Sequence, residues 1–177
     1  VIFSMDETHM EGLADALSCN PGSSLKSLDM EPSMEFASWK HLADAIRFHT
    51  RLESLEVSVV ANTFDEADAA AIVLAELLQV NTTLTHIVNK TNDTLNVAEE
   101  TVNGPVLDAL LANKSLIKLR FFEEDPLFWM AKDAILKRNK ECFDDNEDGN
   151  GRQAFFDQYV SFATLLPGFK QKMCAYC

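Results

Sequence analysis

The sequence LLANKSLIKLRF at positions 110–121 reads as the end of a helix that leads into a short strand, and the same pattern occurs three more times upstream. The strand part fits the template L-x-x-L-x-L, in which the first, fourth and sixth residues are apolar. Eleven of the twelve apolar positions in the four copies are filled as the template requires, and Asn89 is the exception. Successive copies start 27, 32 and 32 residues apart, at Leu25, Leu52, Leu84 and Leu116. The spacing predicts a chain built from stacked repeats.

These motifs resemble the leucine-rich repeats, in particular the long, helix-containing repeats of ribonuclease-inhibitor-like proteins. Each strand motif follows a helix pattern such as LADAL at 13–17 or LADAI at 42–46. The resemblance covers residues 1–141 and implies an α/β leucine-rich-repeat solenoid, a right-handed superhelix whose parallel strands line a concave face. The phrase LLQVNTTL at 77–84 also resembles the repeats of the tropomodulin group of actin-filament capping proteins. Both resemblances imply a protein partner, in actin regulation or in signalling.

The repeat pattern has no fifth copy. Where the template next requires leucine the sequence has Cys142, followed by a run of acidic residues. The strand at 116–122 is therefore predicted to be an edge strand, and natural sheets cover or charge such edges to prevent strand addition. We assign residues 1–141 to about four strand-helix units, and residues 142–177 to an acidic linker, a helical C-terminal cap at 152–166 and a tail.

Composition restricts the class of partner. The chain has 177 residues, 47% of them hydrophobic, which suffices to bury one sizeable core. Its 15 basic and 28 acidic side chains give a formal net charge of −13, which disfavours nucleic acid and anionic membranes as partners. The sequence has no apolar run of the roughly 20 residues that a membrane-spanning helix needs, no secretory signal and no disulfide-type cysteine spacing. We expect a cytoplasmic monomer. Because the chain begins with Val1 and VIF at 1–3 fits the end of another strand, we interpret it as an N-terminally truncated fragment.

The strand residues that alternate with the core leucines are the predicted partner-binding residues, since they face outward on the concave wall of a solenoid. One column consists of Ser27, Ser54, His86 and Lys118. The next consists of Asp29, Glu56, Val88 and Arg120. A third runs through Glu31, Ser58, Lys90 and Phe122, of which we assign Phe122 to the binding face. The wall is predicted to change from acidic to basic along the repeats, a gradient that would orient a partner of opposite gradient. The alternatives are an ordinary solvated sheet face and a face shaped by missing N-terminal repeats.

A column of asparagines follows the helices of the repeats. It contains Asn20, Asn81, Asn113 and Asn139, with His49 in the equivalent place. Asparagine enters the left-handed backbone region more easily than most residues, so we expect this column to close the helices. Four asparagines, Asn81, Asn89, Asn92 and Asn113, also stand in N-x-S/T sequons, which would be glycosylated only in a secreted protein.

Five further predictions concern the helices and their connections. The first helix should bury Gly12, Leu13, Ala16 and Leu17, and the second should begin at Ser38 and bury Trp39, Leu42, Ala43 and Ile46. Residues 59–63 are predicted as a loop, and Pro105 as the first turn of a helix. The helix that begins near Pro126 should present Leu127, Trp129 or Met130, Ala134, Ile135 and Leu136 to the core.

The sequence contains no convincing catalytic, cofactor or metal site. Its four histidines fall in different phases of the repeat, and the C-x-x-C at 174–177 has no second ligand pair at zinc spacing. The segment DDNEDGN at 144–150 resembles the start of an EF-hand loop, but the closing carboxylate is replaced by Phe155. We therefore predict a non-enzymatic protein-interaction module or scaffold of a larger protein. The alternatives are a calcium-responsive regulatory segment at 144–150, a scaffold attached to a missing catalytic domain, or a host-directed effector.

Overall fold

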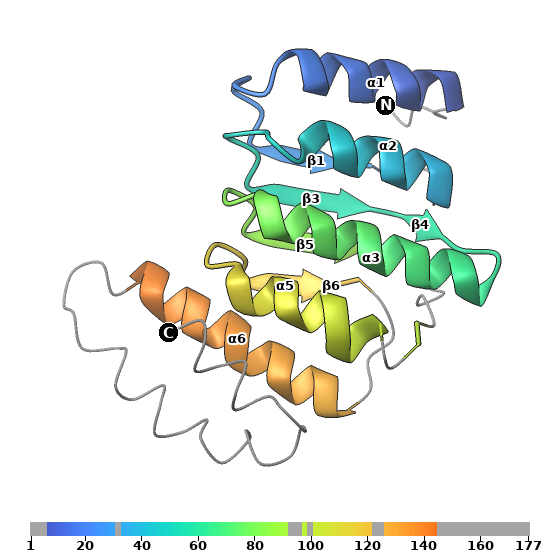
Figure 1. Ribbon diagram of the computed structural model, residues 1–177. Coiled ribbons are helices and arrows are strands. Elements are labelled where there is room, and N and C mark those ends of the chain that lie inside the picture. Colours follow the sequence, from blue (N-terminus) through green and yellow to red (C-terminus); the bar gives the residue numbers. More distant parts are fainter. Residues whose placement is uncertain (1–6, 31–32, 92–96, 99–100, 122–125, 145–177) are drawn as a thin grey trace.

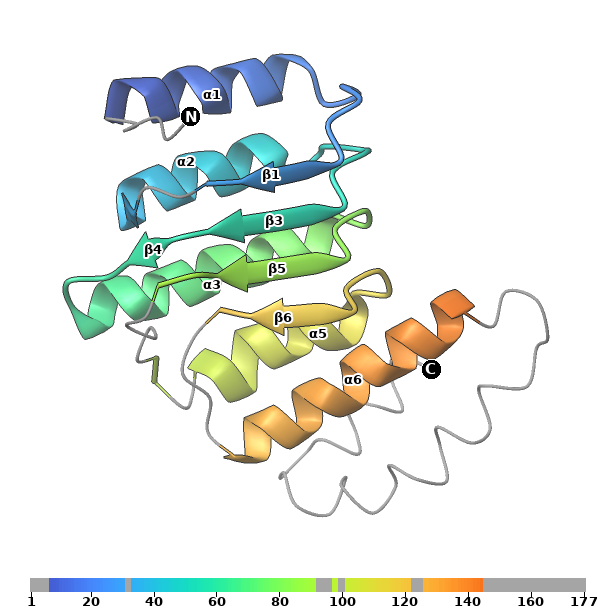
Figure 2. The same cartoon turned by 180° about the vertical axis from the view of Figure 1, so that it is seen from behind.

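The computed structural model describes residues 7–30, 33–91, 97–98, 101–121 and 126–144. They form two layers, one of helices and one of strands (Figure 1). Seen from the opposite side, the strands lie in front and the helices behind them (Figure 2). The fold is mixed α/β with a parallel sheet.

Helices and strands alternate along most of the described chain. The helices are α1 (Glu7–Cys19), α2 (Phe36–Ile46), α3 (Phe64–Val80), α5 (Leu107–Ala112) and α6 (Pro126–Asp144), and the π-helical turn η1 (Val102–Val106) precedes α5. The main sheet consists of β1 (Ser27–Asp29), β3 (Ser54–Val57), β5 (His86–Asn89) and β6 (Lys118–Arg120). A smaller sheet pairs β2 (Met34–Glu35) with β4 (Val59–Val60).

The strands of the main sheet pair in the order β1-β3-β5-β6, and every pair is parallel. Their register places Leu28 opposite Leu55, Leu55 opposite Ile87, and Ile87 opposite Leu119. This confirms the prediction that the central apolar residues of successive copies form one row. Because side chains alternate between the two faces of a strand, the outward-facing columns are aligned in the same register.

One hydrophobic core extends from Met10 on α1 to Leu136 on α6. The predicted stripe of α2 is buried as expected: Trp39, Leu42, Ala43 and Ile46. The indole N–H of Trp39 donates to the carbonyl of Ala70 at 3.1 Å, and its ring centroid lies 5.1 Å from that of Phe121. A fully buried tryptophan whose polar atom is satisfied therefore ties α2 to α3 and to the segment after β6.

The asparagine column acts through its side chains and not through a left-handed backbone. The backbone is extended at Asn81, with φ −77° and ψ 123°, and at Asn113, with φ −73° and ψ 130°. The prediction that these residues close the helices in the left-handed conformation is therefore wrong for both. The amide nitrogen of Asn113 donates to the carbonyls of Leu78 and Asn81, at 2.9 and 3.0 Å. The amide nitrogen of Asn81 donates in the same way to Ile46 and His49, one repeat earlier. Asparagine suits this position because its short side chain carries an amide that can donate hydrogen bonds and accept them at the same time.

Two buried cations of α6 contact the backbone of the last described repeat, one of them at the edge strand β6. Lys132 Nζ donates to the carbonyl of Leu119 at 3.3 Å, and Arg138 donates to the carbonyls of Leu111 and Asn113 at 3.3 and 3.0 Å. Both cations are less than 10% exposed, at 6% and 7%. Buried charges are tolerated where their hydrogen bonds are made, so α6 satisfies backbone carbonyls at the last described repeat.

Several local predictions differ from the structure. The N-cap of α2 is Glu35, and Ser38 lies inside the helix. The predicted loop at 59–63 contains β4, because β3 continues after Ser58 into a second parallel pairing. Pro105 lies within η1 and not in the first turn of an α-helix. Pro105 has no N–H and so removes one backbone hydrogen bond from a regular helix at this position.

Two of the predicted helix faces are confirmed only in part. On α1 Leu17 is buried as predicted, but the other buried residues are Met10 and Ala14, whereas Gly12 and Ala16 are exposed. On α6 the predicted residues Ala134, Ile135 and Leu136 are buried, but Phe128 is buried as well and Trp129 is 52% exposed. Both errors arise where small or amphipathic residues flank the apolar ones on either side, so that two helical phases fit the sequence nearly equally well.

Some predictions fall outside the described residues. They concern the strand at 1–3, Glu31, Phe122, the calcium-like loop beyond Asp144, the capping helix at 152–166 and the C-x-x-C at 174–177. The helix α6 continues to Asp144 and so crosses the boundary that we placed between residues 141 and 142.

Candidate functional site

Eight of the nine predicted binding residues alternate along the main-sheet strands with the core residues Leu28, Leu55, Ile87 and Leu119, so they belong to the opposite face of the sheet. The helices lie on the other side of this sheet (Figure 2). Strand pairing aligns Ser27, Ser54, His86 and Lys118 in one row and Asp29, Glu56, Val88 and Arg120 in the next. The residues on β1 and β6 are exposed, and those on β3 and β5 are half-buried. We call these eight residues the strand face. Phe122, the ninth, lies outside the described residues.

The acidic end of the strand face is already paired, which changes the predicted charge gradient. Lys90, which follows β5, makes ion pairs with Asp29 and with Glu56, the latter at 3.1 Å. The hydrogen bonds that the Lys90 ammonium donates, first to Asp29 and then to Glu56, raise its pKa above the ordinary value. The third column does not form the expected outward row either, because Ser58 is buried. Lys118 and Arg120 have no ion pair with any described acidic residue. Lys90 offsets one of the two acidic charges, so the predicted gradient from acidic to basic is weakened but keeps its direction.

A groove of about 910 Å³ adjoins the first row of the strand face, where helices end and strands begin. We call it the loop groove. It is lined by Lys26, Thr50, Arg51, Glu53, Leu78, Gln79, Thr82, Thr83, Thr85, His86, Ala112, Asn113, Lys114, Ser115 and Ile117. Of these, only His86 belongs to the predicted binding residues. The residues before each strand leucine are polar in every described copy, for example Thr50, Thr82 and Lys114, and that column is the sequence signal for the groove.

His49 occupies the asparagine position in the loop that supplies Thr50 and Arg51 to the groove. Its Nδ1 accepts from the backbone N–H groups of Arg51 and Leu52, at 3.3 and 3.1 Å, and its Nε2 lies 2.9 Å from Ser23 Oγ. Burial lowers the pKa of the His49 imidazole below its ordinary value. Since Nδ1 accepts hydrogen bonds, the neutral ring with its proton on Nε2 fits this geometry. Protonation of Nδ1 would oppose both backbone contacts.

The described residues hold no group of three or more histidine, cysteine, aspartate or glutamate side chains arranged to bind a metal ion. Cys19, on α1, is an exposed free thiol. None of the helices in the described part of the chain has the length and apolar character needed to cross a membrane.

The sequence matches no family model, and no curated protein matches it. Among solved structures, the fold is similar to the C-terminal domain of tropomodulin from Caenorhabditis elegans, with a TM-score of 0.48 and 13% sequence identity. The alignment covers 80% of this chain and 99% of that domain. This is the group that the phrase at 77–84 resembles, and a similarity of this degree carries no inference about what the chain binds.

Proposed function

We propose that this chain is a non-enzymatic protein-interaction module, a leucine-rich-repeat solenoid of the ribonuclease-inhibitor-like kind that binds another protein through its strand face. The observation that supports the proposal is the alignment of eight outward side chains in two rows, on the side of the sheet that the helices leave uncovered. The backbone of such a face is held by the strand pairing, so a partner that binds there has to order side chains but little backbone.

Charge reversal on β6 tests this proposal. The double substitution Lys118→Glu and Arg120→Glu changes two exposed residues of the strand face and leaves the core untouched. Exposed charge contacts contribute roughly 0.2–1 kcal/mol each, and reversal adds repulsion, so affinity for a protein partner should fall about tenfold. The matched control is Lys40→Glu with Lys140→Glu, which makes the same charge change at exposed positions on α2 and α6.

Both variants and the parent chain would be immobilised and used to capture partners from a cell extract, and the affinity of each captured protein would then be measured by surface plasmon resonance. The proposal expects one partner to be weakened by the strand-face variant and retained by the control. Equal affinities for the two variants would reject the strand face as the binding surface. The calcium-responsive alternative has no support among the described residues, because its loop extends beyond them.

A further inference from the structure

Large apolar side chains are exposed on the helix layer at equivalent positions of adjacent repeats. Phe48, which follows α2, is 68% exposed, and Val80, the last residue of α3, is 42% exposed. Each directly precedes the repeat position that His49 and Asn81 hold, and the amide nitrogen of Asn81 donates to the carbonyl of His49 at 3.3 Å. The two apolar residues therefore lie at the same end of neighbouring helices.

The row of exposed residues extends to the helices on either side. Cys19 on α1 and Ala112 on α5 hold the same repeat position, and both are exposed. Hydrogen bonds between the following loops continue across these repeats, from Thr50 to Pro21 and from Asn113 to Asn81. Single exposed apolar residues are common, whereas adjacent ones at an outer face indicate a contact surface. We call Cys19, Phe48, Val80 and Ala112 the apolar row.

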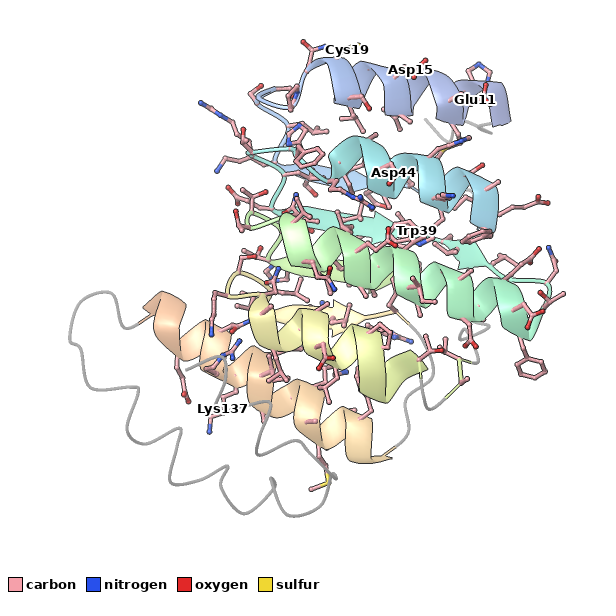
Figure 3. All side chains as sticks on the ribbon, viewed as in Figure 1. Glu11, Asp15, Cys19, Trp39, Asp44 and Lys137 are labelled. Carbon is pink, nitrogen blue, oxygen red and sulfur yellow. The ribbon has the colours of Figure 1, made fainter. Side chains whose placement is uncertain are left out.

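An acidic residue stands four positions before each member of the apolar row. Residues four apart are neighbours on one face of a helix, so the acidic residues form a second row beside the first. Figure 3, which looks onto the helix layer, shows Asp15 and Cys19 on α1 and Asp44 on α2. We call the following residues the acidic row: Asp15, Asp44, Glu76 and Asp108.

The charge around the two rows selects a basic ligand. Arg47 makes ion pairs with Asp44 and with Glu76, at 3.0 and 2.9 Å, and so offsets part of the acidic row. Lys40, four positions before Asp44, is a second exposed cation. When both cations are counted, the four acidic groups still exceed the basic ones. The loops beyond the apolar row carry Arg51 and Lys114, so positive charge on a ligand is favoured only toward the acidic row.

The spacing of the rows suits a helix that lies across the layer. Packed helices are about 8–10 Å apart, so successive members of each row are separated by that distance. An α-helix rises about 1.5 Å per residue, so seven of its residues cover about 10 Å. A crossing helix would thus present every seventh side chain to the next member of a row. An amphipathic helix also carries basic and apolar stripes side by side, whereas side chains of an extended strand alternate between opposite faces.

From these observations we propose that the helix layer is a second interaction surface, which binds a basic amphipathic helix of a protein partner across α1, α2 and α3. The apolar row, with Phe48 at its centre, contacts the apolar stripe of that helix, and the acidic row contacts its lysine or arginine residues. The surface lies on the other side of the main sheet from the strand face (Figures 1 and 2). The inference goes beyond the proposed function and does not depend on it, because each surface can be tested alone.

The probe is a fluorescein-labelled peptide in which the unit Lys-Ala-Gln-Leu-Lys-Ala-Ala occurs three times, a helix of about 30 Å that crosses three helices of the layer. One matched peptide replaces every Lys by Gln, and another keeps the charge but places Pro at a central Ala to break the helix. Fluorescence anisotropy measures affinity, and two-dimensional ¹⁵N–¹H NMR spectra locate the contact. We expect the probe to change the chemical shifts of Asp44, Phe48, Glu76 and Val80, and both matched peptides to bind at least about tenfold more weakly.

Two pairs of variants separate this surface from general attraction to an acidic chain. Phe48→Ser should weaken the probe about tenfold, because burial of a phenylalanine against a partner is worth at least that factor. Phe64→Ser, which removes an equally exposed phenylalanine (69%) at the start of α3, should leave binding unchanged. Asp15→Lys should weaken the probe about threefold or more relative to Asp133→Lys, which makes the same charge change at an exposed position on α6.

Equal losses in Phe48→Ser and Phe64→Ser would overturn the inference, and so would a proline peptide that binds as tightly as the probe. Chemical-shift changes confined to the strand face would overturn it as well. The strand-face variant, Lys118→Glu with Arg120→Glu, should bind the probe at least as tightly as the parent chain does. If that variant loses the probe, the peptide binds at the strand face and the inference fails, whereas the proposed function is unaffected.

Discussion

Replacing Asn113 by alanine should destabilise the fold much more than the same change at Asn20, although the two residues hold equivalent places in the repeat. Asn113 is 4% exposed. Its amide donates to the carbonyls of Leu78 and Asn81 and accepts from the backbone N–H groups of Ser115 and Leu116, at 3.0 and 2.8 Å. Asn20 is exposed, and its amide donates one hydrogen bond of 3.2 Å to Ala16.

The expected magnitude follows from the groups that lose their partner. A buried donor or acceptor left unsatisfied costs about 1–3 kcal/mol. Asn113→Ala deprives four backbone groups of the amide, and water can reach those next to half-buried Ser115, so roughly two of them stay uncompensated. We therefore expect a loss of about 3–4 kcal/mol in the free energy of unfolding. At Asn20, where water replaces the lost contact, the loss should be about 0.5 kcal/mol or less.

Urea unfolding followed by far-ultraviolet circular dichroism measures both losses. For a domain of this size each kcal/mol shifts the melting temperature by about 2–4 °C, so Asn113→Ala should melt about 10 °C below the parent chain. If Asn113→Ala and Asn20→Ala lose the same amount, the buried amide is not what holds the loops together, and the reasoning is refuted.

Replacing Asn113 by aspartate tests the donating NH₂ group of the amide separately from the accepting oxygen. Asn113→Asp keeps the oxygen that accepts from Ser115 and Leu116, but its carboxylate faces the carbonyl oxygens of Leu78 and Asn81. A protonated carboxyl can donate to one of them, so this variant should regain stability relative to the parent chain as the pH falls below about 5. A loss of stability that is independent of pH would show that the donor half contributes nothing.

Two further changes test groups near the binding surfaces. The pKa of His49 is lowered by burial, so the stability that depends on neutral His49 is complete above its ordinary pKa of about 6.5 and falls as the pH drops toward the lowered value. His49→Asn, which restores the repeat residue, should flatten this part of a plot of melting temperature against pH, and an unchanged slope would contradict the role. Lys90→Met should lower stability because Asp29 and Glu56, which face each other in register, lose their shared cation. That loss should shrink in high salt, and an unfolding midpoint equal to that of the parent chain would count against the ion pairs.

The rows of the sheet could be predicted because each depends on a local pattern repeated in register. Leu28, Leu55, Ile87 and Leu119 align as the template implies, and the outward rows follow from alternation. The charge of the face could not be predicted in the same way. Lys90 is 61 residues from Asp29 in sequence, and no spacing rule connects the two. The sequence register predicts where the Cα atom of each charged residue lies. It does not predict where the charged end of a long, flexible side chain lies.

The loop groove was accessible to sequence reasoning only in part. The hydroxyl and basic residues before each strand leucine form a visible column, but a hollow between loops depends on how far the loops project. That distance depends on side-chain contacts with the backbone. Asn81 donates to carbonyls of the preceding loop, and His49 accepts from N–H groups of its own loop. A histidine in a column of asparagines is a weak signal until its Nδ1 is seen to accept two backbone N–H groups.

Asn89, the exception to the apolar template, follows the same physical rule as the loop asparagines. It is 4% exposed, and its amide donates to the carbonyls of Val59 and Phe121 and accepts from the N–H of Val59 at 2.9 Å. Here β3 has continued into β4 while β5 ends, so the neighbouring backbones separate and the amide replaces the pairing that they lose.

The residue two positions after each of these asparagines completes the arrangement. Thr83, Thr91 and Ser115 each donate a hydroxyl to the preceding asparagine oxygen, at 3.2, 3.0 and 3.1 Å. The N-x-S/T triplets at Asn81, Asn89 and Asn113 are thus side-chain turns with a buried amide, a geometry that leaves no access for a glycan. Asn89 stands at the sixth template position, so there the burial of a satisfied amide takes the place of the burial of an apolar side chain.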